Sequence, residues 1–449
     1  MIRLGSVGPD GRATGPGGGR AVGADGVRLQ VDLYEDRYSR LRLLPWWDQD
    51  RLRRSHVLVV GAGALGNEIV KNLALVGIGR LTIVDMDVVE HSNLSRSVLF
   101  RAADEGKPKA AVAAARACEL NPDVRAAWIQ GSIIDDVGMG LFRSADVVAA
   151  GVDNREARLA INQKCWRVGV PWVDGAIEAL SGVARVFVPP AGACYECTLD
   201  GRDYELMARR RTCALLSRDE MLSGKVPTTP TSASIVAAIQ VQEVLKLLHR
   251  DRGLAVLEGR GFIYYGHLND AYVVTYPRRE DCLSHDPFPS VRVEPWSART
   301  ATPAALIEAS RRAGHDPMAP AAEPTRSREV DGPPSEHPPA PENAPARASW
   351  AVELPGELCL AARCRGCRVE RPLRRPLRRL THRDVACPGC GEVMELDLTH
   401  TVSEGSWLAG YPLIELGVPL WDIVTVVGPH GQRFHWELAA DRAELLSQA

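Results

Sequence analysis

The feature that most constrains the fold is a glycine-rich loop between an apolar strand and a helix. Val57–Val60 form the strand, the loop reads GAGALG, and a second apolar run, Leu81–Val84, ends on Asp85. Glycines at these spacings permit a tight turn and let a phosphate approach the backbone at the helix N-terminus. The pattern predicts half of a nucleotide-binding βαβ unit, in which Asp85 accepts hydrogen bonds from ribose hydroxyls. The loop glycines are Gly61, Gly63 and Gly66.

Further strand-like runs alternate with helical patterns over residues 31–290. This alternation predicts an α/β fold, namely a Rossmann-like domain whose mostly parallel sheet carries helices on both faces. The expected strands are Val57–Val60, Leu81–Val84, Ala126–Ile129, Asp146–Ala149 and Trp172–Val173.

Composition divides the rest of the chain. Residues 1–30 are glycine-rich and poor in apolar side chains, which predicts disorder. Residues 291–348 are rich in Pro and Ala and are predicted to be a linker, although Thr302–Ala313 could form a short helix. Residues 349–449 regain strand and turn signals and predict a small domain made of a zinc ribbon and further β-structure.

The charge balance argues against two classes of partner. The chain has 54 Lys plus Arg and 56 Asp plus Glu, which favours neither nucleic acid nor a membrane surface. No apolar run reaches membrane-spanning length and no signal pattern is seen, so a cytoplasmic protein is expected. In a reducing compartment, close cysteine pairs hold zinc more often than they form disulfides.

Polar residues after the second strand exceed what a dinucleotide-binding fold needs. Asp87, Asn93, Arg96 and Lys109 follow Asp85 along one polar segment. Arg96 and Lys109 could grip triphosphate oxygens and stabilise charge on the α-phosphate in its transition state. A plain NAD-binding fold with surface charges is the alternative, but it explains only the glycines and Asp85.

A further carboxylate follows another strand. Asp153 stands after Asp146–Ala149, at a strand end of the kind where ligands usually bind. A carboxylate there suits Mg²⁺, which takes few protein oxygens and keeps water and phosphate ligands.

Together these motifs resemble the ThiF/MoeB/HesA superfamily, the adenylating core of ubiquitin-activating enzymes, over about Tyr34 to His285. The resemblance implies that ATP is used, with Asp85 on the ribose and Asp153 on Mg²⁺. It also implies phosphate contacts from the positions of Asn93, Arg96 and Lys109. The RYSR segment matches a family segment whose last arginine, here Arg40, reaches into the partner subunit's site, so a homodimer is expected. Two departures are Ala64 for a frequent glycine and Ser97 for a frequent glutamine.

A candidate acyl-carrying cysteine lies downstream. Cys213 follows three arginines, which would lower its thiol pKa and raise its thiolate fraction. In single-chain activating enzymes a cysteine before a similar Pro-Thr-Thr helix start forms the thioester, although the spacer here is longer. The alternative is a buried, inert cysteine, as is expected for Cys118 and Cys165.

Two cysteine-rich sets are candidate zinc sites. The first follows from the family resemblance, which pairs Cys194 and Cys197 with a downstream pair that here reads Cys282 and His285; a lost site with relic cysteines is the alternative. The second follows from spacing, since two Cys-x-x-Cys pairs nineteen residues apart fit a zinc ribbon better than a redox dithiol. Gly366 and Gly389 are expected to supply permissive backbone inside its turns. The ligands of this second site are Cys364, Cys367, Cys387 and Cys390.

The C-terminal segment predicts a hairpin. A Gly-Pro-His-Gly turn separates two strand-like runs, Ile423–Val427 and Arg433–Leu438. The sequence LGVP-x-WDIVTV is similar to the C-terminal fold by which some activating enzymes recruit a conjugating enzyme. The arginine run Arg368–Arg379 could contact nucleic acid, but a solvated or partner-facing strip is favoured.

The interpretation is an ATP-dependent activating enzyme for a ubiquitin-like protein. It would adenylate the partner's C-terminal glycine, hold it as a thioester on Cys213, and pass it to an E2-like conjugating enzyme. The resemblance extends to bacterial conjugation systems, some of which act in antiphage defence. A sulfur-carrier adenylyltransferase and a non-catalytic scaffold remain alternatives.

Overall fold

The computed structural model describes residues 35–205, 227–315 and 349–446, and the chain forms two compact units, residues 1–47 and 48–449. In the first unit a short 3₁₀ helix, η1 (Leu41–Leu43), follows a turn in which Asp36 pairs with Arg42. The second unit holds both sheets of the structure. The glycine-rich residues 1–30, predicted to be disordered, lie outside the described residues.

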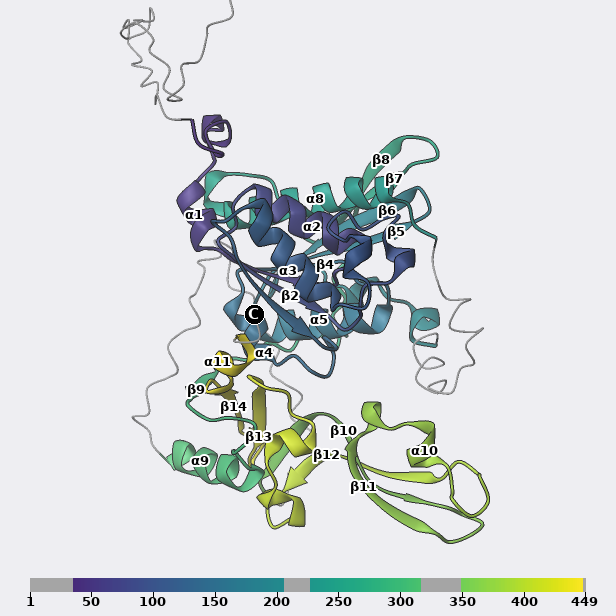
Figure 1. Ribbon diagram of the computed structural model, residues 1–449. Helices are drawn as coiled ribbons and strands as arrows, with labels where there is room; N and C mark the ends of the chain where they lie inside the picture. Colours follow the sequence, from purple (N-terminus) through teal and green to yellow (C-terminus); the bar gives the residue numbers. More distant parts are fainter. Residues whose placement is uncertain (1–34, 206–226, 316–348, 447–449) are drawn as a thin grey trace, which may run out of the picture. The chain divides into compact units, whose positions relative to one another are not determined.

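An eight-stranded sheet forms the larger part of the second unit (Figure 1). Its strand order is β3-β2-β1-β4-β5-β6-β7-β8; the first five of these pair in parallel, and β5 to β8 are antiparallel. All five strands expected from the sequence are present, so the Rossmann-like prediction is confirmed. The strands are β1 (His56–Val60), β2 (Arg80–Asp85), β3 (Arg125–Gln130), β4 (Val147–Ala150), β5 (Trp172–Glu178), β6 (Ser181–Phe187), β7 (Arg260–Tyr265) and β8 (Asp270–Thr275).

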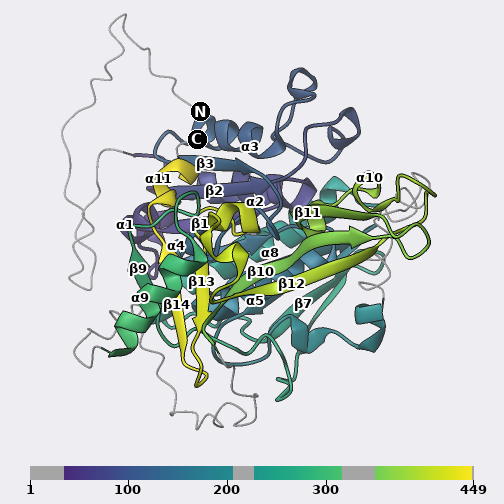
Figure 2. The same ribbon diagram turned by 90° about the horizontal axis from the view of Figure 1, so that it is seen from below.

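Helices cover both faces of this sheet. Right-handed crossovers place α2 and α3 on one face, where α8 joins them, and α4 and α5 on the other (Figures 1 and 2). A short helix, α1, precedes β1, and its N-cap Asp48 accepts a hydrogen bond from the Arg51 N–H. The helices are α1 (Gln49–Arg54), α2 (Ala64–Leu75), α3 (Lys109–Leu120), α4 (Met139–Ser144), α5 (Arg155–Val168) and α8 (Pro230–Leu248).

Helix α8 corrects one expectation from the sequence. By length and composition alone it could cross a membrane, although no run of that kind was expected. In the fold it packs on α2 and on the sheet. Its buried Gln240 donates to the Ala150 carbonyl, and its buried Glu243 accepts from the Leu257 N–H. These contacts are those of a core helix.

The C-terminal domain has a second sheet of order β11-β10-β13-β14-β9, with β12 also paired to β10. β13 and β14 form the predicted antiparallel hairpin. Short helices accompany this sheet, and the last of them also contacts β3 of the first sheet. They are η6 (Leu377–Arg379), α10 (His382–Val385), η7 (Trp407–Gly410), η8 (Leu413–Leu416) and α11 (Asp441–Leu446). The strands are β9 (Arg292–Glu294), β10 (Ala351–Arg363), β11 (Glu370–Pro376), β12 (Glu395–Ser403), β13 (Ile423–Val427) and β14 (Arg433–Leu438).

The linker predicted over residues 291–348 is wrong for its first part. β9 pairs in parallel with β14, and α9 (Pro303–His315) buries Leu306 and Ile307 in the core of the C-terminal domain. The short helix expected over Thr302–Ala313 is confirmed as α9. Composition missed β9 because a three-residue strand needs little apolar sequence once a neighbouring sheet supplies the rest of the core. Residues 316–348 lie outside the described residues.

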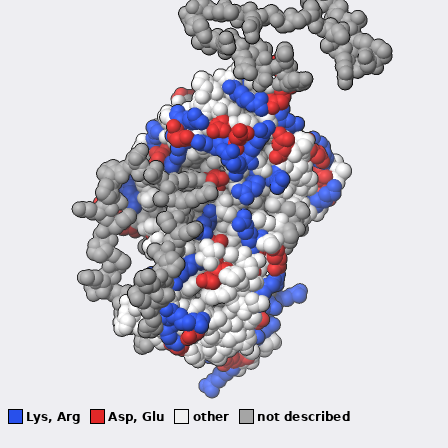
Figure 3. Space-filling model, turned by 90° about the vertical axis from the view of Figure 1, so that its left-hand side faces the viewer, with Lys and Arg blue, Asp and Glu red and all other residues white. Residues whose placement is uncertain are grey.

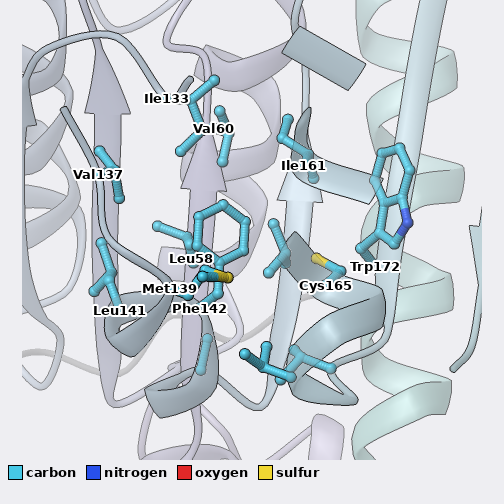
Figure 4. Close-up of a cluster of buried hydrophobic side chains, with 14 of the residues drawn as sticks. Leu58, Val60, Ile133, Val137, Met139, Leu141, Phe142, Ile161, Cys165 and Trp172 are labelled. Atoms are coloured by element: carbon cyan, nitrogen blue, oxygen red, sulfur yellow. The ribbon is translucent and has the colours of Figure 1, made fainter. Parts of the chain in front are cut away.

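One hydrophobic cluster contains residues of both sheets. On the face of α4 and α5, side chains from β1 and the helices pack together around Leu58, Met139 and Phe142 (Figure 4). Trp421 and Ile423 of the C-terminal domain belong to the same buried cluster. On the face drawn in Figure 3, acidic and basic side chains are interspersed, in keeping with the balanced composition.

Candidate functional site

The glycine loop has two glycines that packing requires and one that faces open space. Gly61 has a φ of +90°, and a Cβ added there would lie 2.6 Å from the Gly151 carbonyl oxygen. A Cβ on Gly66 would lie 1.8 Å from the Gly61 oxygen. A Cβ on Gly63, the N-cap of α2, would meet no atom of the described residues within 4 Å. Gly63 therefore faces the open space in which a phosphate could approach the start of α2.

Asp85 closes the loop from the end of β2. Its carboxylate accepts hydrogen bonds from the Ala62 N–H at 2.6 Å and from the Asp87 N–H at 2.8 Å. Burial raises its pKa, and these two backbone donors oppose that rise. Asp85 thus lies beside the glycine loop, as the sequence predicted.

Lys109 and Asp87 form an ion pair at the start of α3. Lys109 Nζ lies 2.8 Å from Asp87 Oδ2, and the Lys109 N–H also donates to the Asp87 carbonyl. The lysine side chain is only 11% exposed. Residues 22 positions apart in sequence thus meet beside Asp85, and the ammonium group is held in a defined place.

Asn93 and Arg96 occupy the connecting loop. Asn93 is buried, and its Oδ1 accepts from the Glu90 N–H at 2.9 Å, which caps the 3₁₀ helix η2 (His91–Asn93). Arg96 is half-buried and donates to the Ser92 carbonyl at 2.8 Å. A second 3₁₀ turn, η3 (Ala102–Asp104), leads on to α3.

Asp153 lies beyond the end of β4, next to the glycine loop. The chain order reverses between β1 and β4, and ligands of such sheets bind at this switch point. The Asp153 side chain is exposed and accepts a hydrogen bond from Asn154 Nδ2 at 3.2 Å. An exposed carboxylate fits Mg²⁺, which would keep most of its water ligands.

A buried ionic network supports this edge, and the sequence interpretation did not find it. Asp174 on β5 is fully buried and accepts hydrogen bonds from Arg158 Nε and Arg185 Nε, both at 2.9 Å. Burial disfavours the charged carboxylate, but the two arginines outweigh it and lower the pKa of Asp174. Arg158 also donates to the Val152 carbonyl, so it fixes the residue before Asp153. An aspartate inside an apolar strand was the available signal.

The first zinc candidate set converges in the structure. The four ligand atoms all lie within 4.8 Å of one another. Cys194 Sγ lies 3.8 Å from Cys197 Sγ and 3.5 Å from Cys282 Sγ. Tetrahedral zinc with Zn–S bonds of about 2.3 Å needs sulfurs about 3.8 Å apart, so the set fits the ion.

His285 completes this first set. Its Nε2 lies 3.5 Å from Cys197 Sγ, and its ring stacks on Trp166 with centroids 4.5 Å apart. Hydrogen bonds from Cys194 and Cys282 lower the pKa of Cys197, which favours the thiolate that a metal requires. The site would join the β6 side of the sheet to the segment that leads into the C-terminal domain.

The second set also converges, in the ribbon formed by β10, β11 and β12. Cys364 Sγ and Cys390 Sγ are 3.6 Å apart, and all four sulfurs lie within 4.8 Å of one another. Backbone N–H groups of Gly389 and Cys390 lower the pKa of Cys387 to about 7. The expected role of Gly366 and Gly389 is wrong. The positive φ angles fall just after each pair, at Arg368 and Gly391, because the chain turns back there.

Two predicted residues stand apart from these sites. Arg40 belongs to the first unit, where it precedes η1 and is exposed. Cys213 lies outside the described residues. On either side of its segment, η4 (Glu196–Thr198) contains the zinc candidate Cys197, and Thr229 caps α8 by accepting from the Ser232 N–H.

Residues 35–282 match the model of the ThiF family. The chain belongs to the ThiF family. It is 36% identical over 267 residues to the SAMP-activating enzyme E1 of Haloferax volcanii, a match that covers 57% of this chain and 91% of that protein. This confirms the resemblance to the ThiF and MoeB group of E1-like proteins.

Other relatives match over shorter spans. The sulfur carrier protein adenylyltransferase of Thermus thermophilus is 39% identical over 36% of this chain and 63% of its own length. The catalytic subunit of the NEDD8-activating enzyme E1 of Schizosaccharomyces pombe is 38% identical over 32% of this chain and 34% of its own length. A crystal structure of E. coli MccB with ATP is 22% identical and has a TM-score of 0.48, over 57% of this chain and 75% of that one.

Proposed function

We propose that this protein is an ATP-dependent activating enzyme for a ubiquitin-like protein, which adenylates the C-terminal carboxylate of that partner. The observation that supports it most is the edge formed by Gly63, Asp85 and the Lys109–Asp87 pair. A dinucleotide site would need only the first two. The similarity to an activating enzyme over 91% of that relative points to the same chemistry.

The mechanism follows from where each group lies. The start of α2 and the open space at Gly63 receive the phosphates, and Asp85 binds the ribose hydroxyls. Lys109 releases Asp87 and turns its ammonium group to the triphosphate, while Arg96 adds a second positive charge. Asp153 would hold Mg²⁺, which supplies charge neutralisation on the departing pyrophosphate.

The first step joins the partner to AMP. A carboxylate oxygen of the partner's C-terminus attacks the α-phosphorus, the bond from that phosphorus to the β-phosphate oxygen breaks, and pyrophosphate leaves. Negative charge builds on the phosphate oxygens in the transition state. Lys109 and Arg96 stabilise that charge more strongly than the charge of bound ATP.

The second step moves the acyl group to Cys213. The thiolate attacks the carbonyl carbon of the acyl-adenylate, a C–S bond forms, and AMP leaves with the electrons of the broken C–O bond. The thioester then passes to the cysteine of an E2-like conjugating enzyme. We assign docking of that enzyme to the C-terminal domain, and two chains form the working homodimer in the cytoplasm.

A protein partner is also supported by an apolar patch on the β7–β8 hairpin. Tyr265 and Tyr272 stack on one face of this hairpin and are 43% and 45% exposed, and Leu268 in its turn is 78% exposed. Clustered exposed apolar side chains mark protein contact surfaces. This patch would hold the folded body of the ubiquitin-like protein.

A sulfur-carrier adenylyltransferase is the second candidate, favoured by the similarity to the Thermus thermophilus enzyme of that name. It shares the adenylation step but needs neither the Cys213 thioester nor a conjugating enzyme. The two candidates therefore differ in a covalent intermediate that can be measured.

The decisive experiment combines the protein with its candidate ubiquitin-like partner, ATP and Mg²⁺, followed by intact mass measurement with and without reductant. The proposal expects a reductant-sensitive adduct that is lost in Cys213→Ala and kept in Cys118→Ala, whose thiol lies on α3. Pyrophosphate release without an adduct would support the sulfur-carrier candidate instead.

A further inference from the structure

The start of helix α4 is capped by the C-terminal domain. Gly138 precedes this helix and offers no side chain to its free N–H groups. The Met139 N–H donates instead to Asp422 Oδ1 at 2.8 Å, across 283 residues of sequence. The Gly140 N–H donates to the Trp421 carbonyl at 2.9 Å. The first domain thus depends on the second for these hydrogen bonds.

The contact between α4 and Trp421 is tight. A Cβ on Gly138 would lie 2.4 Å from the Trp421 carbonyl oxygen, and one on Gly140 would lie 2.3 Å from the Trp421 ring. Trp421 and Asp422 are each only 2% exposed. Both glycines are therefore needed for the C-terminal domain to reach the helix start, and water is excluded from the hydrogen bonds there.

Residues 131–138, which connect β3 to α4, also lie at the nucleotide edge. The Gly131 N–H donates to the Asp85 carbonyl at 3.2 Å, and Gln130 is the register partner of Asp85. The strand order is β3-β2-β1. With phosphates at the end of β1 and ribose at the end of β2, the base of ATP must extend towards the end of β3, where this connection begins.

Further contacts fix the same connection. Lys164 on α5 donates from Nζ to the carbonyls of Ile133 at 2.7 Å and Val137 at 2.6 Å. Arg379 of the C-terminal domain lies 2.7 Å from Asp136. Because that ion pair is half exposed, it contributes little by itself. Asp422, which is buried and accepts from a backbone N–H, is the stronger anchor.

We propose that the C-terminal domain holds the base-binding edge of the nucleotide site, with Asp422 as a positioning residue that acts through residues 131–138. The proposal rests on the proposed function only in taking ATP as the ligand. The C-terminal domain would then support ATP binding in addition to docking the conjugating enzyme.

The test measures the affinity of the full-length protein for two probes, ATP and inorganic tripolyphosphate, by isothermal titration calorimetry. Tripolyphosphate lacks base and ribose, so it reports only on the glycine loop and Lys109. Asp422→Ala should bind ATP about tenfold more weakly and tripolyphosphate with unchanged affinity, since one buried N–H loses its acceptor. Asp422→Asn keeps an acceptor oxygen and should bind ATP within about twofold of the wild type.

Ser406→Ala is the matched control. It removes another capping side chain of the C-terminal domain, which accepts from the Leu408 N–H at 3.2 Å at the start of η7. It should leave ATP affinity unchanged. Wild-type ATP affinity in a folded Asp422→Ala protein would overturn the proposal. Equal weakening of both probes would also overturn it, because that pattern means general damage.

Two further readouts keep the outcomes separate. If Asp422→Ala does not fold, the double variant Arg378→Ala, Arg379→Ala replaces it. It removes both surface ion pairs to Asp135 and Asp136 and should weaken ATP binding about threefold to fivefold. Unchanged binding in that variant would overturn the proposal. A wild-type protein that binds neither probe would contradict the proposed function itself. Hydrogen exchange at Met139 and Gly140 would still show whether Asp422 holds this edge, because faster exchange is expected only in Asp422→Ala.

Discussion

Lys109 is the residue on which the proposed chemistry depends most. Its side chain is nearly buried, and an ion pair with Asp87 holds it beside the glycine loop. We expect Lys109→Ala to slow ATP–pyrophosphate exchange by about a hundredfold, as loss of one transition-state charge contact does in other enzymes. Lys107→Ala, which removes a half-exposed lysine paired with Asp104, is the control and should retain exchange. Undiminished exchange in Lys109→Ala would contradict the assigned role.

Asp174 is a single residue on which the stability of the folded protein depends. Asp174→Asn would leave two buried arginines without their carboxylate and should lower the free energy of unfolding by about 3–5 kcal/mol, measured by denaturant titration. Asp50→Asn, at an exposed ion pair, should change it by less than about 1 kcal/mol.

The same carboxylate makes stability depend on pH. The arginines hold the pKa of Asp174 in the folded protein below its ordinary value of 3.8. Its contribution to stability is therefore present above pH 3.8 and is lost as the pH falls through the lower folded-state pKa. Asp174→Asn should lack this part of the acid dependence, and an unchanged acid profile in the variant would count against the network.

At the scale of elements, one glycine of the loop is required for packing and another for the proposed ligand binding. Gly66→Ala places a methyl group against the Gly61 carbonyl and should destabilise the protein by about 3 kcal/mol or more. Gly63→Ala meets open space, so its melting temperature should match the wild type while its ATP affinity falls at least tenfold, a rough figure for a blocked phosphate approach. Calorimetry measures both, and normal ATP binding by Gly63→Ala would contradict the phosphate assignment.

The two cysteine sets make a second prediction about elements. Elemental analysis should find two zinc ions per chain, one for each converged set. Cys282→Ser and Cys387→Ser should each lose one ion, whereas Cys118→Ser should lose neither. A full zinc content in Cys282→Ser would show that the first set does not bind the metal.

At the scale of the whole molecule, the expected homodimer places Arg40 of one subunit in the site of the other. Arg40→Ala and Lys109→Ala alone should each keep only about a hundredth of wild-type activity. Mixed dimers made by co-expression should regain about a quarter to a half of wild-type activity, because one of their two sites is intact. No recovery in purified mixed dimers would contradict a role for Arg40 across the interface.

The sequence by itself determined the local elements and the residues with the strongest chemistry. Strand periodicity predicted β1 to β5, and glycine spacing located the phosphate loop, since both depend on backbone geometry within a few residues. Cysteine spacing identified the second converged set, because a metal needs particular ligands at particular separations, and the family resemblance identified the first.

Only the tertiary structure decided how distant residues complete one another. Three features join segments that lie far apart in the sequence, so no local sequence pattern predicts them. They are the capping of α4 by Asp422, the Arg158–Asp174–Arg185 network and the pairing of β9 with β14. Each depends on burial that the packed sheets create: a hydrogen bond or ion pair gains its importance once water is excluded and an unpaired group becomes costly. The sequence contains these polar groups, but the tertiary structure determines which of them pair.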